Sequence, residues 1–154
     1  RRIPERFVPS RPRFPPILGA AMTTVLRGIG DTSTRALSTY ERTMTWRIQE
    51  QVRFMAALSA GRAVSSATSS YILSQLHPIA SQQWGLATVG ASAVKGGWLR
   101  ADTETRQMGI LDGYAVAIIS TAGPAQLQSD GDYAHVAQMN TLAQMLHQRL
   151  TTSR

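Results

Sequence analysis

Residues 108–122 read Met-Gly-Ile-Leu-Asp-Gly-Tyr-Ala-Val-Ala-Ile-Ile-Ser-Thr-Ala, and the way they fold decides the class of this protein. Apolar side chains recur there at steps of three and four, the spacing of one face of a helix. These side chains are Met108, Leu111, Ala115, Ile118 and Ala122. The β-branched content of residues 114–120 leaves a strand as the alternative. We predict a helix, and with it an all-α protein.

The clearest helical stripe lies upstream of this stretch. It consists of Leu37, Tyr40, Met44, Ile48, Val52, Met55 and Leu58. Gly61 is expected to end this helix, although an Ala/Ser-rich continuation toward Pro78 is the alternative. Further helices are expected at residues 17–27, 79–94 and 133–150. The sequence therefore predicts a four- to five-helix bundle over residues 17–154. We expect a single domain, because a chain of 154 residues has the length of one domain.

Residues 1–16 differ in composition from the rest and form a predicted extended arm. They hold five of the seven prolines and five of the fifteen arginines. Each proline removes a backbone donor and moves its predecessor toward extended geometry, so no helix is expected. We predict that the arm is strapped onto a neighbouring subunit, with Phe7 and Phe14 as apolar anchors. The polar contacts would come from Arg6, Arg11 and Arg13.

The basic charge is confined to the N-terminal part of the chain. The formal net charge is +7, and up to residue 62 there are eleven arginines and four acidic residues. From residue 63 onward, five basic and five acidic residues balance. We therefore expect Arg35, Arg42 and Arg53 to extend the partner-binding surface of the arm. Such a surface favours an anionic partner, which could be protein carboxylates, nucleic acid or lipid headgroups.

The residues that could carry chemistry do not form a recognisable site. The chain has no cysteine, which excludes disulfides and thiolate metal sites. The glycines of residues 28–33 and 90–96 do not match a phosphate-binding loop. Asp132 and His135 can share a helix face, and we interpret them as a helix cap beside a surface histidine. We predict no catalytic residue, cofactor or metal site.

These observations predict a non-enzymatic structural or assembly subunit of a larger multi-protein complex. A virion, a secretion apparatus or an organellar complex would each be compatible. One alternative is a nucleic-acid-binding protein that uses the arm and the first long helix. A second alternative is a small helical enzyme built around Asp132 and His135.

The sequence assigns no cellular compartment. No apolar run reaches the about 18 residues of a transmembrane helix, and no apolar signal-peptide core is visible. The first residue is Arg1 rather than methionine, which we interpret as the result of processing or of fragmentation.

Overall fold

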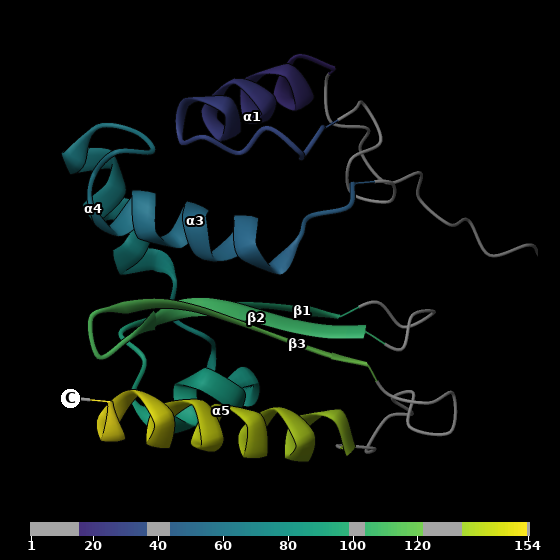
Figure 1. Ribbon diagram of the computed structural model, residues 1–154, viewed down its shortest axis with the longest axis vertical. Coiled ribbons are helices and arrows are strands. Elements are labelled where there is room, and N and C mark those ends of the chain that lie inside the picture. The colour runs from purple at the N-terminus through teal and green to yellow at the C-terminus, as the bar shows by residue number, and fades with distance from the viewer. Residues whose placement is uncertain (1–15, 37–43, 99–103, 122–133, 154) are drawn as a thin grey trace, which may run out of the picture.

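The protein is a mixed α/β structure in three layers, described here for residues 16–36, 44–98, 104–121 and 134–153 of a computed structural model (Figure 1). Its α-helices are α1 (Pro16–Gly28), α3 (Ile48–Ser59), α4 (Ser66–Gln75) and α5 (Ala134–Thr152). Two short 3₁₀ helices are η1 (Ala80–Gln82) and η2 (Gly85–Val89). The strands are β1 (Ala93–Trp98), β2 (Glu104–Leu111) and β3 (Tyr114–Thr121).

The prediction of an all-α bundle is wrong, because the three strands form an antiparallel sheet in the order β1-β2-β3. Residues 108–121 form no helix: β2 ends at Leu111 and β3 begins at Tyr114, its register partner, and residue 122 lies outside the described residues. Between them, Asp112 has φ 52° and Gly113 has φ 83°. Two successive left-handed residues stop a helix, and they form the tight turn whose twist matches an antiparallel hairpin.

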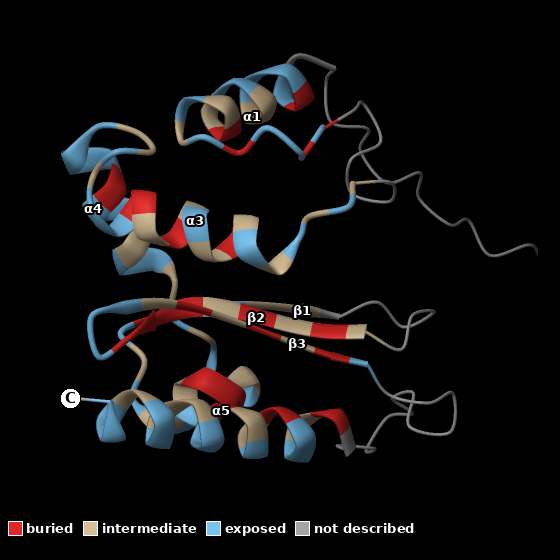
Figure 2. Cartoon of the chain, viewed as in Figure 1, coloured by how far each residue is buried: buried red, intermediate tan, exposed pale blue. Residues whose placement is uncertain are grey.

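The sheet lies between two helical layers. Figure 1 shows α3 over one face of the sheet and α5 under the other. Neighbouring residues of β2 enter opposite cores: Ile110 packs in the cluster with Met55 and Leu58 of α3, whereas Leu111 packs in the cluster with Met139 of α5. Because successive side chains point to opposite faces of a strand, β2 contributes apolar side chains to both cores. Figure 2 shows the buried residues on the sheet and on the sides of α3 and α5 that face it.

The other predicted helices have mixed outcomes. The helices expected at residues 17–27 and 133–150 are confirmed as α1 and α5. The long stripe forms a helix only from Ile48, and α3 ends at Ser59, before Gly61, as expected. Residues 44–47 are not helical, and residues 37–43 lie outside the described residues. The helix expected at residues 79–94 is wrong, because η1, η2 and the start of β1 occupy that range.

The turn after α1 is organised by a buried carboxylate. Asp31 is fully buried, and its Oδ1 accepts hydrogen bonds from the backbone N–H groups of Ser33 and Thr34, both at 2.9 Å. Arg27 donates to the carbonyl oxygens of Asp31 and Thr34. Burial alone would raise the pKa of Asp31, but the hydrogen bonds from Thr34 and Ser33 outweigh it and hold the pKa below its ordinary value of 3.8.

Arg53 connects this turn to α3. Its Nη1 donates to the carbonyl oxygen of Gly30 at 2.9 Å, and its Nε lies 3.1 Å from Oε2 of Glu50. The guanidinium thus joins two segments 23 residues apart in the sequence. The contact between α1 and the rest of the protein therefore depends in part on polar groups.

We predict that this contact weakens in acid. Because the pKa of Asp31 is lower in the folded state, its stabilising contribution is complete above the unfolded value of 3.8 and is lost as pH falls through the folded value. The free energy of unfolding, measured in urea from about pH 5 to about pH 3, should therefore fall more steeply for the wild type than for Asp31→Asn. Asparagine keeps the acceptor oxygen without titrating. Equal slopes would contradict this role of Asp31.

We also predict that Gly109 cannot be replaced by alanine without loss of stability. A Cβ at this position would lie 2.3 Å from the carbonyl oxygen of Ala93, so β1 and β2 would have to separate. We expect Gly109→Ala to lower the free energy of unfolding by about 1–3 kcal/mol. In the matched variant Gly97→Ala, on β1, the added Cβ meets no atom within 4 Å, and we expect a neutral or slightly stabilising effect in the same urea titration.

Candidate functional site

The side chain of Gln107 holds the segment that precedes β1 against the sheet. Gln107 lies in the central strand and is 1% exposed. Its Oε1 accepts from the backbone N–H of Leu86 at 2.8 Å, and its Nε2 donates to the carbonyl oxygen of Trp84 at 3.0 Å. From the other side, Oδ1 of Asn140 on α5 accepts from the backbone N–H of Gly85 at 2.6 Å. Residues 84–86 are thereby fixed between β2 and α5.

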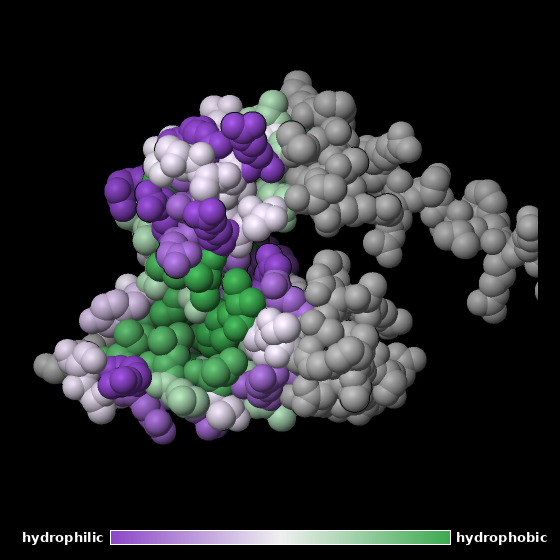
Figure 3. Space-filling view, turned by 45° about the vertical axis from the view of Figure 1, so that its right-hand side comes forward, coloured by the Kyte–Doolittle hydropathy of each residue, from purple (hydrophilic) through white to green (hydrophobic). Residues whose placement is uncertain are grey.

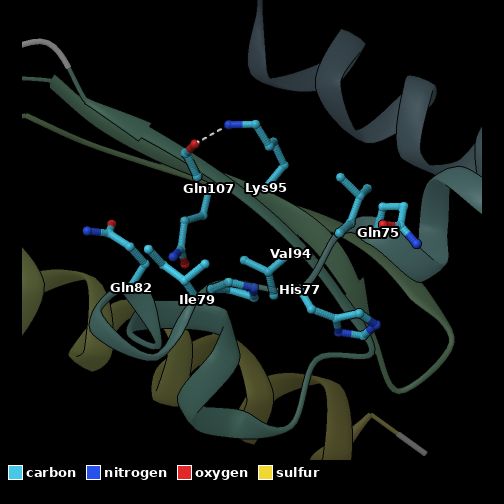
Figure 4. Close-up of a pocket in the computed structure, with 10 residues that line it drawn as sticks. Gln75, His77, Ile79, Gln82, Val94, Lys95 and Gln107 are labelled. Carbon is cyan, nitrogen blue, oxygen red and sulfur yellow. Dashed lines mark hydrogen bonds between the residues drawn. The ribbon is translucent and has the colours of Figure 1, made fainter.

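A pocket of about 190 Å³ lies beside Gln107, along β1 (Figure 4). It is lined by Gln75, Leu76, His77, Pro78, Ile79, Gln82, Val94, Lys95, Gly96 and Gln107. Lys95 is the single lysine of the chain, and its Nζ donates to the carbonyl oxygen of Gly96 at 2.5 Å. No carboxylate is among these lining residues. The pocket therefore offers hydrogen-bonding groups but no carboxylate for acid–base chemistry.

Hydrogen bonding shows which backbone groups of β3 face away from the sheet. The N–H of Val94 donates to the carbonyl oxygen of Leu76 at 2.7 Å, away from β2. Because backbone direction alternates along each strand, its partner Gly109 faces β3, and Val116 opposite Gly109 faces β2. The residues on either side of Val116 and Ile118 must then direct their N–H and C=O groups outward. These are Ala115, Ala117 and Ile119.

The outward edge of β3 is apolar and uncharged. The strand reads Tyr-Ala-Val-Ala-Ile-Ile-Ser-Thr, with neither a charged residue nor a proline. Figure 3 shows an apolar surface between the two helical layers, at the level of the sheet. Among the described residues, the backbone hydrogen bonds outside the regular elements include none to β3. Proteins usually protect such edges with charges, prolines or a covering segment, because a free edge pairs with other strands.

The predicted partner-binding residues are not brought together among the described residues. Arg35 is exposed, whereas Arg53 bonds to Gly30 and Glu50 of its own chain. The remaining ones lie outside the described residues, and they are Arg6, Phe7, Arg11, Arg13, Phe14 and Arg42. The predicted basic surface therefore stays a prediction for the arm, and at Arg53 the guanidinium has a structural role.

The histidine considered for a catalytic or metal site is in the interior. His135 is 5% exposed, and its ring meets that of Trp84 edge-to-face with centroids 5.8 Å apart. Its interpretation as a surface histidine is therefore wrong, because the first turn of α5 packs against the segment that Gln107 holds. Asp132 lies outside the described residues. The described residues contain no group of three metal-ligating side chains.

Sequence reasoning missed both Gln107 and the outward edge of β3, for which no bonded partner other than β2 is found among the described residues. The edge had a signal, because Asp112-Gly113 between apolar runs is typical of a hairpin turn. No sequence signal pointed to Gln107, because a sequence does not distinguish a buried glutamine from an exposed one. Its partners are backbone groups of residues about 20 positions away, which only the folded chain brings close.

Comparisons with protein-family models, curated proteins and solved structures found no match. None of the helices that the structure describes has the length and apolarity needed to cross a bilayer. The functional argument therefore rests on the geometry of the described residues.

We predict that removal of the Gln107 amide destabilises the protein. Gln107→Met keeps a similar side-chain volume but leaves the N–H of Leu86 and the carbonyl of Trp84 buried without this partner. The free energy of unfolding should fall by about 2–4 kcal/mol. In the control variant Gln82→Met, at the partly exposed rim of the same pocket, we expect a change within about 0.5 kcal/mol. Equal stability of the two variants, measured in urea by tryptophan fluorescence, would contradict the role of Gln107.

Proposed function

We propose that this chain is a non-enzymatic structural subunit that joins a multi-protein complex through the free edge of β3. The observation that carries the proposal is an eight-residue edge strand without charge or proline. Among the residues that the structure describes, no backbone hydrogen bond outside the regular elements reaches β3, so the outward groups of Ala115, Ala117 and Ile119 would be donors and acceptors for another strand. Addition of a strand to such an edge is a general mode of protein recognition, in which main-chain hydrogen bonds supply affinity.

The surroundings of β3 support this proposal. β3 lies between the two cores, with Val116 and Ile118 in the core on the α5 side and Ala115 packed against the core on the α3 side. A docked strand would thus form backbone hydrogen bonds in the plane of the sheet and apolar contacts above and below it. Both kinds of contact exclude water, which strengthens the hydrogen bonds.

The arm of residues 1–16 would provide a second contact in the same complex. Prolines favour extended backbone, so we expect an unbound arm of this sequence to lose less entropy on docking than an arm without prolines. Phe7 and Phe14 would fill apolar depressions on a neighbouring subunit, while the arginines pair with its carboxylates. This part of the proposal rests on the sequence of the arm alone.

Binding to nucleic acid is less well supported than assembly with proteins. Arg27 and Arg53 donate to carbonyl oxygens of their own chain, which lowers the number of guanidinium groups available for phosphates. The sheet and α5 belong to the part of the chain that has no net charge. A phosphate-tracking surface would need a continuous basic groove.

The proposal predicts protein contacts at the end of β3 and not on the outer side of α5. A photo-cross-linking amino acid at Thr121, exposed at the end of the strand, should form adducts with protein in cells that express the chain. The same group at Gln144, exposed on α5, is the control and should form few. Equal yields at the two positions would contradict the proposal. Adducts with nucleic acid alone, in a complex that dissociates steeply with salt, would favour the alternative.

A further inference from the structure

We infer that the pocket beside β1 binds one residue of an extended, neutral peptide segment of a partner protein. The pocket lies at the opposite edge of the sheet from β3, so this binding site is additional to the one in the proposed function. The contacts would come from two backbone groups of β1, the carbonyl oxygen of Val94 and the N–H of Gly96. The peptide would supply an N–H for the first and a carbonyl oxygen for the second.

The alternation of backbone groups places both of these groups at the outer edge of β1. The N–H of Val94 donates to the carbonyl oxygen of Leu76 at 2.7 Å, so the backbone groups of Val94 face away from β2. The pairing of β1 with β2 is continuous from Ala93 to Trp98, so Gly96, two residues further, faces the same way. Both residues line the pocket. Among the residues that the structure describes, neither the carbonyl of Val94 nor the N–H of Gly96 has a hydrogen-bond partner.

The chain beside β1 cannot satisfy these groups itself. Pro78 lines the pocket two residues after Leu76, and a proline has no N–H to donate to the carbonyl of Val94. The carbonyl of Ile79 is already used, because it accepts from the N–H of Gln82 at 2.8 Å. Val94 is only 4% exposed, so its carbonyl has little access to water. A buried carbonyl without a partner is costly, and a ligand that donates to it removes this cost.

The two groups match one residue of a parallel strand. They belong to the residues on either side of Lys95. In a parallel pair, the residue opposite Lys95 would donate its N–H to the carbonyl of Val94 and accept from the N–H of Gly96. An antiparallel strand would also need the N–H of Val94 and the carbonyl of Gly96, which already bond to Leu76 and to the amine of Lys95. The unpaired groups therefore favour a peptide that runs parallel to β1.

The size and polarity of the pocket suit such a residue. Its volume of about 190 Å³ equals that of about six water molecules at ~30 Å³ each, which is enough for one residue with a small side chain. Ile79, one of the lining residues, is 71% exposed, so this side of the pocket is open to solvent and a longer chain can continue outward.

The charges of the pocket favour a neutral peptide over an ion. No carboxylate lines the pocket, so a basic ligand finds no counter-charge there. Figure 4 shows the amine of Lys95 and the amide of Gln107 on opposite sides of the strands, so the lysine does not place its charge beside Gln107. A small anion is therefore less suited to this pocket than a peptide group, which both donates and accepts.

The first test varies the ligand and leaves the protein unchanged. The probe is N-acetyl-alanine N-methylamide, which is one residue between two peptide groups. In NMR spectra of the isotope-labelled full chain, the backbone N–H resonance of Gly96 should shift and saturate with a dissociation constant in the millimolar range. The same probe methylated on the alanine nitrogen cannot donate to the carbonyl of Val94 and should bind about fivefold more weakly.

Three results of this titration would overturn the inference. The first is a Gly96 resonance that does not move up to about 50 mM probe, well above the expected range. The second is equal affinity for the two probes. The third is an equal shift with sodium acetate, which would assign the pocket to small anions instead.

The second test removes the donor on the protein. Gly96→Pro deletes the outward N–H, and proline is tolerated in an edge strand where its nitrogen faces outward. Gly96→Ala is the matched control, because it adds a Cβ beside Gln107 but keeps the N–H. With the side-chain amide of Gln82 as the reporter, Gly96→Ala should bind the probe within about twofold of the wild type, and Gly96→Pro at least about fivefold more weakly. Equal binding by the two variants contradicts the role of this N–H. If Gly96→Pro does not fold, the methylated probe on the wild-type chain still decides.

Discussion

The amide of Gln107 is the contact on which the arrangement of the lower layer depends. Its Nε2 donates to the carbonyl oxygen of Trp84 and its Oε1 accepts from the N–H of Leu86. Both hydrogen bonds lie inside a core, where water cannot replace them. A buried polar group without a partner is costly, so this geometry strongly favours one position of the 84–86 segment over others. Leu86 and Trp84 then fill the space between the sheet and α5.

The two edges of the sheet therefore differ in the hydrogen bonding of their backbone groups. The segment held by Gln107 follows residues 75–82, which pass along β1, and Leu76 there accepts from Val94. β1 therefore has part of its outer edge bonded within the chain. β3, which follows the tight turn, has its edge toward the apolar surface of Figure 3. β3 and β1 form opposite edges of the sheet, and strand addition is proposed at the uncharged β3 edge.

The candidate site was only partly predictable. The apolar, β-branched run of residues 114–120 was visible as a possible strand, and the Asp112-Gly113 turn was a local signal for a hairpin. Which edge of the sheet would be free was not visible, since it depends on where Leu76 and the helices lie. The charge pattern predicted a basic surface, but it did not show that Arg53 bonds to the carbonyl of Gly30, because that partner is 23 residues away.

The sequence by itself determined α1, α5 and the C-terminal half of the long stripe, since caps, glycine breaks and apolar spacing are local features. It also determined the absence of disulfides and the segregation of charge. Only the tertiary structure decided that residues 79–94 and 108–121 do not form α-helices. Their small and apolar residues fit a period of three to four as well as a period of two. Left-handed backbone at Asp112 and Gly113, strand pairing and the Gln107 contact selected the sheet, and these act through space rather than along the chain.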